Sequence, residues 1–147
     1  MIRHFIFNLT LDNNGKKVFT RLFEFIDKNK LSIRWGSKGF SANVTNKSDF
    51  IGIFFGWPIN SPWGQTVATG FGQVEKKLEK NQSIINFYKT EIDKLNLFNE
   101  PANFFSSQEL KWNIKNINEN QLDELIKILE KVAELVKDEM NNIASAQ

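Results

Sequence analysis

The chain of 147 residues predicts an α+β fold. We expect a single domain, residues 1–147, with an antiparallel sheet of four to five strands and about four helices packed mainly on one face. Three observations lead to this prediction. Short segments alternate apolar and polar residues, as strands with one buried face do. Longer segments repeat apolar residues at helical spacing. The composition, 41% hydrophobic and 24% charged, is typical of one globular domain of this length.

The N-terminal segment predicts a strand followed by a helix. Residues 4–11 alternate apolar and polar side chains, which predicts a first strand with one buried face. Apolar residues recur at helical spacing after the turn Asn13-Asn14-Gly15, so residues 15–29 predict a helix that covers the sheet.

The next segment predicts three consecutive strands. Residues 31–35 and 40–45 predict a hairpin that reverses at Gly36-Ser37-Lys38-Gly39. The continuous apolar run of residues 50–55 predicts a central strand covered on both faces. Alternation assigns the side chains of strand 40–45 to two faces, with Phe40, Ala42 and Val44 buried and Ser41, Asn43 and Thr45 exposed.

The second half of the chain predicts three helices and one strand. Ser61 and Pro62 are typical of a helix start, and apolar residues at helical spacing extend this helix to Leu78. Residues 83–95 predict another helix and residues 110–114 a short strand. The final helix, 119–142, is apolar over about half its circumference. It is either wedged between the sheet and another helix or forms a homodimer or partner contact.

The composition limits the chemistry of the protein. The absence of Cys excludes disulfides, thiolate nucleophiles and Cys-ligated metal centres, and His4 is the only imidazole. Neither a metal nor a cofactor is predicted. No secretion signal and no segment long enough to span a membrane is recognised, so we expect a cytoplasmic protein without a membrane partner. The excess of Lys over Arg, with frequent Asn, Ile and Phe, suggests AT-rich coding in a bacterium or phage.

Two fragments resemble the RNA-recognition motif family. Phe5-Ile6-Phe7-Asn8-Leu9 is similar to the first-strand motif of that family, and Lys38-Gly39-Phe40 is similar to the start of its third-strand motif. The resemblance implies that Phe5 and Phe40 are exposed and stack on bases. Strand alternation instead places Phe40 in the core, so no site residue is taken from the resemblance.

Two further patterns suggest alternative functions. Residues 1–60 contain nine Lys and Arg against four Asp and Glu, a net charge of +5, which suits nucleic-acid association. Glu109-Leu110-Lys111, with Asp49 as a second carboxylate, resembles half of a Mg²⁺-dependent nuclease site. Alternating Glu and Lys are also common on solvated surfaces, which makes a hydrolase the weaker alternative.

The loop of residues 56–65 is the candidate recognition surface. Its two tryptophans and two prolines form a stiff segment that loses little entropy on binding. Alternatively, the tryptophans close the end of the core. We favour a non-catalytic module that recognises a protein partner through this loop and the C-terminal helix. The predicted binding residues are Trp57, Trp63, Arg34, Lys38 and Gln65.

Overall fold

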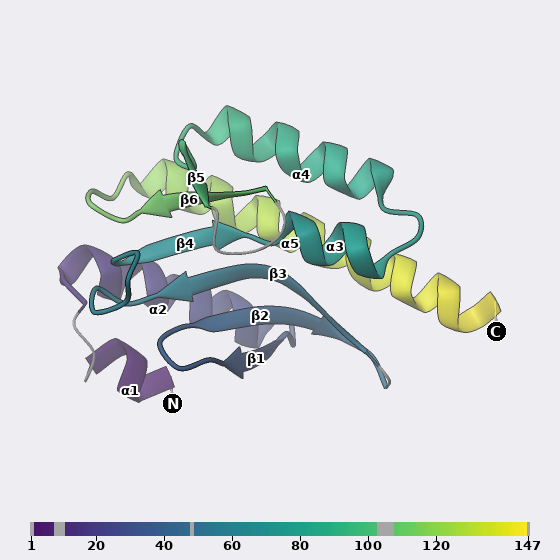
Figure 1. Cartoon of the computed structure of the whole chain (residues 1–147), viewed down its shortest axis with the longest axis horizontal. Coiled ribbons are helices and arrows are strands. Elements are labelled where there is room, and N and C mark those ends of the chain that lie inside the picture. Colours follow the sequence, from purple (N-terminus) through teal and green to yellow (C-terminus); the bar gives the residue numbers. More distant parts are fainter. Residues whose placement is uncertain (1, 8–10, 48, 103–107, 147) are drawn as a thin grey trace.

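A computed structural model describes residues 2–7, 11–47, 49–102 and 108–146 (Figure 1). Within these residues one antiparallel sheet contains six strands in the order β1-β2-β3-β4-β6-β5. The α+β class is confirmed, with one strand more than the upper limit predicted. The strands are β1 (Ser32–Trp35), β2 (Phe40–Thr45), β3 (Phe50–Trp57), β4 (Thr66–Thr69), β5 (Glu100–Ala102) and β6 (Glu109–Asn113). The helices are α1 (Ile2–Phe7), α2 (Asn13–Lys28), α3 (Phe71–Lys77), α4 (Gln82–Leu95) and α5 (Glu119–Ala146).

The helices are packed mainly on one face of the sheet, as predicted. In Figure 1, α2 and α5 lie behind the strands, and α5 contacts β2, β3 and α2. Phe25 of α2 packs on Phe54 of β3, with ring centroids 6.3 Å apart. α4 lies along α5, and its buried Tyr88 hydroxyl donates a hydrogen bond of 2.7 Å to the Ile53 carbonyl oxygen. The hydrophobic core therefore lies between the sheet and these helices.

The hairpin and the long helices form where the sequence predicts them. Asp12 caps α2, since its carboxylate accepts a hydrogen bond of 2.8 Å from the Gly15 amide. The Gly36 amide donates to the Gly39 carbonyl at 2.8 Å and closes the β1–β2 hairpin. α5 packs against the sheet, α2 and α4, which is the wedged arrangement. A homodimer through this helix stays a prediction.

The predicted burial in β2 is confirmed, but of the three residues predicted to be exposed only Thr45 is exposed, and Ser41 is half-buried. Phe40, Ala42 and Val44 are buried, but so is Asn43, which we expected to be exposed. A bulge interrupts the β2–β3 register between Ala42 and Asn43. The Asn43 amide donates to both Oγ and the carbonyl oxygen of Ser41, and its Oδ1 lies over Gly52, which has no side chain to displace it. Hydrogen bonding satisfies the buried amide.

The predicted N-terminal strand is wrong. Residues 2–7 form α1, residues 8–10 lie outside the described residues, and Leu11 precedes α2. Phe5 and Ile6 are both buried, a pair of neighbours that a strand with one buried face cannot bury together. Phe5 packs edge-on against Phe19 of α2 and Phe40 of β2, at 4.9 and 5.3 Å between ring centroids. These long-range contacts outweigh the local alternation.

The helix predicted to start at Ser61 is also wrong. Residues 66–69 form β4, which pairs with β3 on one side and β6 on the other, and a helix begins only at Phe71. Two of the four residues are threonines and one is a valine, and such β-branched side chains suit a strand. The apolar spacing from Val67 to Leu78 arises from a strand followed by a short helix.

No helix in the described part of the chain combines the length and the apolar character needed to cross a membrane.

Candidate functional site

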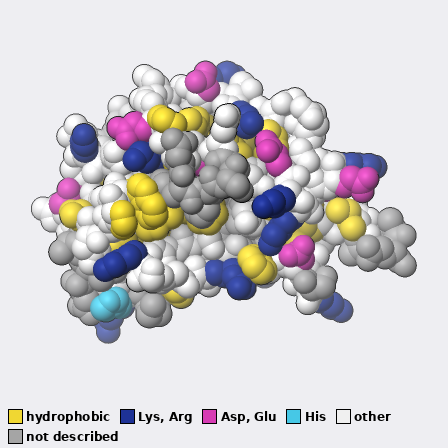
Figure 2. Space-filling view, viewed as in Figure 1, with side chains coloured by type: hydrophobic (Ala, Val, Ile, Leu, Met, Phe, Trp, Pro, Cys, Tyr) yellow, Lys and Arg dark blue, Asp and Glu magenta, His cyan; other side chains and the backbone are white. Residues whose placement is uncertain are grey.

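The face of the sheet turned away from α2 and α5, here called the open face, carries the candidate site. Phe40, Ala42 and Phe54 point toward the helices, so alternation along the paired strands turns Ser41 and Phe55 to the open face. Figure 2, seen from the same side as Figure 1, shows hydrophobic side chains gathered where β3 ends and β4 begins. Lys and Arg side chains lie around them.

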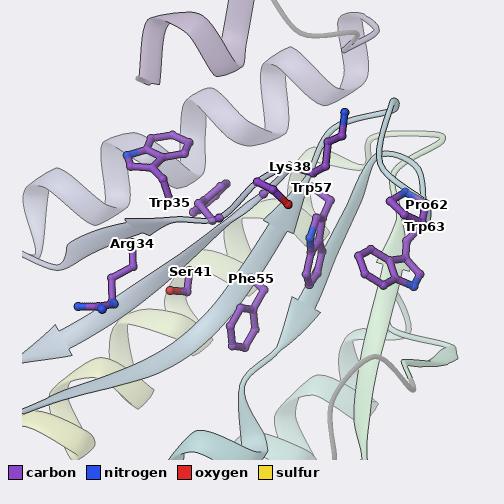
Figure 3. Close-up of a pocket in the computed structure, with 12 residues that line it drawn as sticks. Arg34, Trp35, Lys38, Ser41, Phe55, Trp57, Pro62 and Trp63 are labelled. Atoms are coloured by element: carbon purple, nitrogen blue, oxygen red, sulfur yellow. The ribbon is translucent and has the colours of Figure 1, made fainter.

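Three aromatic rings form a cluster on the open face (Figure 3). Phe55 and Trp57, two residues apart on β3, are nearly parallel, with ring centroids 6.1 Å apart and an interplanar angle of 18°. Trp63 lies against Trp57 at 5.1 Å and 58°. None of the three belongs to the described hydrophobic core cluster, although Trp57 itself is buried. The sheet therefore has a second aromatic cluster, separate from the core.

A groove of about 490 Å³ lies over this cluster. Phe55 and Trp57 line it from β3, Pro62 and Trp63 from the loop after β3, and the turn 36–39 from the hairpin. Gly39 is required here, because a Cβ at this position would clash with the Gly56 carbonyl oxygen and the Trp57 indole. Trp57, which this turn approaches closely, is only 8% exposed, whereas Phe55 and Trp63 are half-buried.

Two turns fix the loop that carries Trp63. The Ser61 amide donates to the Pro58 carbonyl at 3.1 Å, and the Gly64 amide donates to the Ser61 carbonyl at 3.2 Å. The Ser61 hydroxyl donates to the Gly64 carbonyl at 3.0 Å, so Ser61 stabilises a turn and does not cap a helix. Gly64 has φ +75°, a conformation that favours glycine. These hydrogen bonds restrain the backbone on both sides of Trp63.

The groove is lined by two cations, Arg34 and Lys38, and by no carboxylate among the described residues. The Arg34 guanidinium lies 3.8 Å from the centroid of the Phe50 ring, and Lys77 Nζ lies at the same distance from that centroid. In the described part of the chain, neither Arg34 nor Lys38 forms an ion pair. Lys77, in contrast, pairs with Asp49 at 3.6 Å. The groove therefore has a positive rim.

The structure brings together four of the five predicted binding residues. Arg34, Lys38, Trp57 and Trp63 all line the groove, but Gln65 does not. The Gln65 side chain is buried toward α2, where its amide donates to Asp12 Oδ1 at 2.9 Å and to the Ile114 carbonyl at 3.0 Å. Gln65 therefore links α2, β4 and the end of β6. Sequence reasoning missed Phe55 and Ser41, although alternation from Phe40 and the pairing of β2 with β3 could have placed them here.

The residues of the Mg²⁺-dependent hydrolase hypothesis lie apart. Glu109 is bonded to the amides of Phe71 and Gly72 at the start of α3, whereas Asp49 pairs with Lys77 at the end of that helix. Seven helical residues separate the two ends by roughly 10 Å. Lys111 pairs with Glu100 at 3.7 Å. Within the described residues, no group of three or more His, Asp or Glu side chains could hold a metal ion.

The base-stacking residues implied by the RNA-recognition motif are placed in the core. Phe5 is 1% exposed on a helix and Phe40 is 3% exposed on β2, so neither can stack on a base. Comparisons of the chain with protein family models, curated proteins and solved structures found no match. The function proposed next therefore rests on the geometry of the open face.

Proposed function

We propose that the protein is a non-catalytic cytoplasmic binding module that recognises a protein partner through the open face of its sheet. The recognition surface consists of Phe55, Trp57 and Trp63 with Arg34 and Lys38 at its rim.

One observation carries this proposal: large aromatic rings are clustered outside the core, over a groove with a positive rim. A protein that only had to fold would place such rings between the sheet and the helices, where burial stabilises most. Clustered apolar groups at the surface are typical of interaction sites. Trp and Arg, both present here, are the residue types most enriched among the anchors of protein interfaces.

The arrangement of the rings favours a protein over a nucleic-acid strand. Bases stack on aromatic rings whose faces are free. Here Phe55 and Trp57 are stacked on each other, Trp63 packs against Trp57, and Arg34 lies over the Phe50 ring. The groove beside these packed rings suits an apolar side chain of a partner. The basic N-terminal half is equally compatible with an acidic protein surface.

Site-specific photo-crosslinking in lysate of the source cells tests the proposal. A benzophenone amino acid in place of Ser37, an exposed residue of the turn that lines the groove, is expected to crosslink to a protein. The same amino acid in place of Lys137, an exposed residue of α5, serves as the control and is expected to give no such product. Combining the Ser37 probe with Trp63→Ala should reduce the crosslink if the aromatic cluster anchors the partner.

Crosslinks that arise only from the α5 position would move the recognition surface to the C-terminal helix. Crosslinks from Ser37 to nucleic acid alone would contradict the choice of a protein partner.

A further inference from the structure

We infer that the groove on the open face binds an acidic, extended segment of the partner, in which an aromatic side chain enters the hollow and a neighbouring carboxylate reaches Arg34 or Lys38. The inference rests on the proposed function and adds the chemistry of the bound segment to it.

The charges around the groove select an anionic segment. Three other cations, Lys77, Lys89 and Lys111, are paired with carboxylates of this chain at 3.6, 3.4 and 3.7 Å. Arg34 and Lys38 have no such partner among the described residues, and no described carboxylate lines the groove. A carboxylate of a partner placed here is attracted by Arg34 and Lys38, and no described carboxylate in the groove competes for them. Charge complementarity of this kind selects partners and speeds their association.

Arg34 is already oriented for a carboxylate. Its guanidinium lies over the Phe50 ring at 3.8 Å, which restricts the side chain before binding. A guanidinium carries N–H groups in a planar fork that matches the two oxygens of a carboxylate. Arg34 remains exposed in this position.

The dimensions of the site suit a short extended segment. Arg34 lies on β1 and Phe55 on β3, two strand spacings away, which is roughly 10 Å. An extended chain covers that distance in about three residues. The carboxylate and the aromatic side chain are therefore expected within about three positions of each other. The groove of about 490 Å³ lies in the size range of pockets that enclose small ligands, so it accommodates a large side chain.

Binding of defined polymers tests the inference. The probes are a random copolymer of glutamate and tyrosine, polyglutamate, and single-stranded oligothymidylate, each titrated into the full chain at low salt. Intrinsic tryptophan fluorescence reports binding, because Trp57 and Trp63 line the groove. We expect the glutamate–tyrosine copolymer to bind and to change the fluorescence, and polyglutamate to bind more weakly.

Matched variants locate the binding. Arg34→Gln and Lys38→Gln should each weaken binding of the copolymer by roughly two- to fivefold, the scale of an exposed ion pair. Trp63→Ala should remove most of the difference between the copolymer and polyglutamate. Lys137→Gln on α5 removes the same charge far from the groove and should leave the affinity unchanged. Circular dichroism of each variant verifies that the fold is retained.

Three results would overturn the inference: tighter binding of oligothymidylate than of the copolymer, equal binding of copolymer and polyglutamate, or Arg34→Gln and Lys38→Gln variants that bind like wild type. If the Ser37 probe still crosslinks to a protein in any of these cases, the proposed function stands and only the chemistry of the segment is wrong.

Discussion

Replacement of Glu109 by Ala is expected to destabilise the protein more than any loss of a surface charge. The Glu109 side chain is 3% exposed and lies on β6, yet it connects to the junction of β4 and α3. Its Oε1 accepts hydrogen bonds of 2.8 Å from the Thr69 hydroxyl and from the Phe71 amide. Its Oε2 accepts one of 2.9 Å from the Gly72 amide.

The size of the effect follows from the donors that the substitution leaves behind. A buried donor without an acceptor costs about 1 to 3 kcal/mol. Since water can reach the partly exposed Gly72, we take the lower half of this range, about 1 to 2 kcal/mol, for each of the three donors, which gives a loss of unfolding free energy of about 3 to 6 kcal/mol. Glu109→Gln keeps one acceptor oxygen but turns an N–H₂ group toward a donor. The unfolding free energy should therefore fall less for Glu109→Gln than for Glu109→Ala.

Urea denaturation followed by circular dichroism measures the effect. With a slope of about 1 to 3 kcal/mol per molar urea, the midpoint of Glu109→Ala should fall by on the order of 2 M. Glu100→Ala is the control, because this exposed carboxylate pairs with Lys111 at 3.7 Å and should contribute no more than about 1 kcal/mol. If Glu109→Ala unfolds within 1 kcal/mol of wild type, roughly the error of the comparison, Glu109 does not hold the start of α3.

Three further substitutions or titrations have definite expected results. Phe40→Ala should cost about 3 to 5 kcal/mol of unfolding free energy because it leaves a cavity in the core. Phe55→Ala, on the open face, should cost less than about 2 kcal/mol. Equal losses in urea denaturation would contradict the separation of the two clusters. Hydrogen bonds from the Gly15 amide and then from the Gln65 side chain lower the pKa of Asp12. The stability contributed by ionised Asp12 is therefore present above its unfolded pKa of about 3.9 and is lost as pH falls through the lower folded pKa. The difference in unfolding free energy between wild type and Asp12→Ala should thus shrink in acid. A difference that does not depend on pH would refute this. Burial, and then the charge of Glu109, raise the pKa of Tyr88, the one tyrosine of the chain, well above its usual range, so tyrosinate absorbance should appear only as the protein unfolds in alkali.

Local patterns were sufficient for most of the fold. The hairpin, β3, α4 and α5 were predicted from alternation, turn residues and helical spacing. This was possible because the backbone hydrogen bonds of these elements join residues close in sequence. The same patterns failed for α1 and β4. A run of six residues fits both a strand and a helix, and contacts of Phe5 with Phe19 and Phe40 decided between them. β4 exists because β3 and β6 pair with it on both sides.

The candidate site divides in the same way. Arg34 and Lys38 are brought near each other by one hairpin, and Trp57 and Trp63 by one loop, so the sequence alone determined that these residues cluster. Which face each side chain occupies depends on sheet pairing and on the helices that cover the other face. Gln65 turned inward because its amide finds acceptors on Asp12 and Ile114, 53 and 49 positions away in the chain.

The sequence by itself therefore determined the α+β class, the hairpin and the concentration of aromatic and basic residues near it, since short-range periodicity and turn chemistry govern these. Only the tertiary structure decided that Glu109 is a buried acceptor at the start of α3 and that a second aromatic cluster lies outside the core. Both depend on which distant segments share a surface, and burial, hydrogen-bond satisfaction and steric fit are properties of that shared surface.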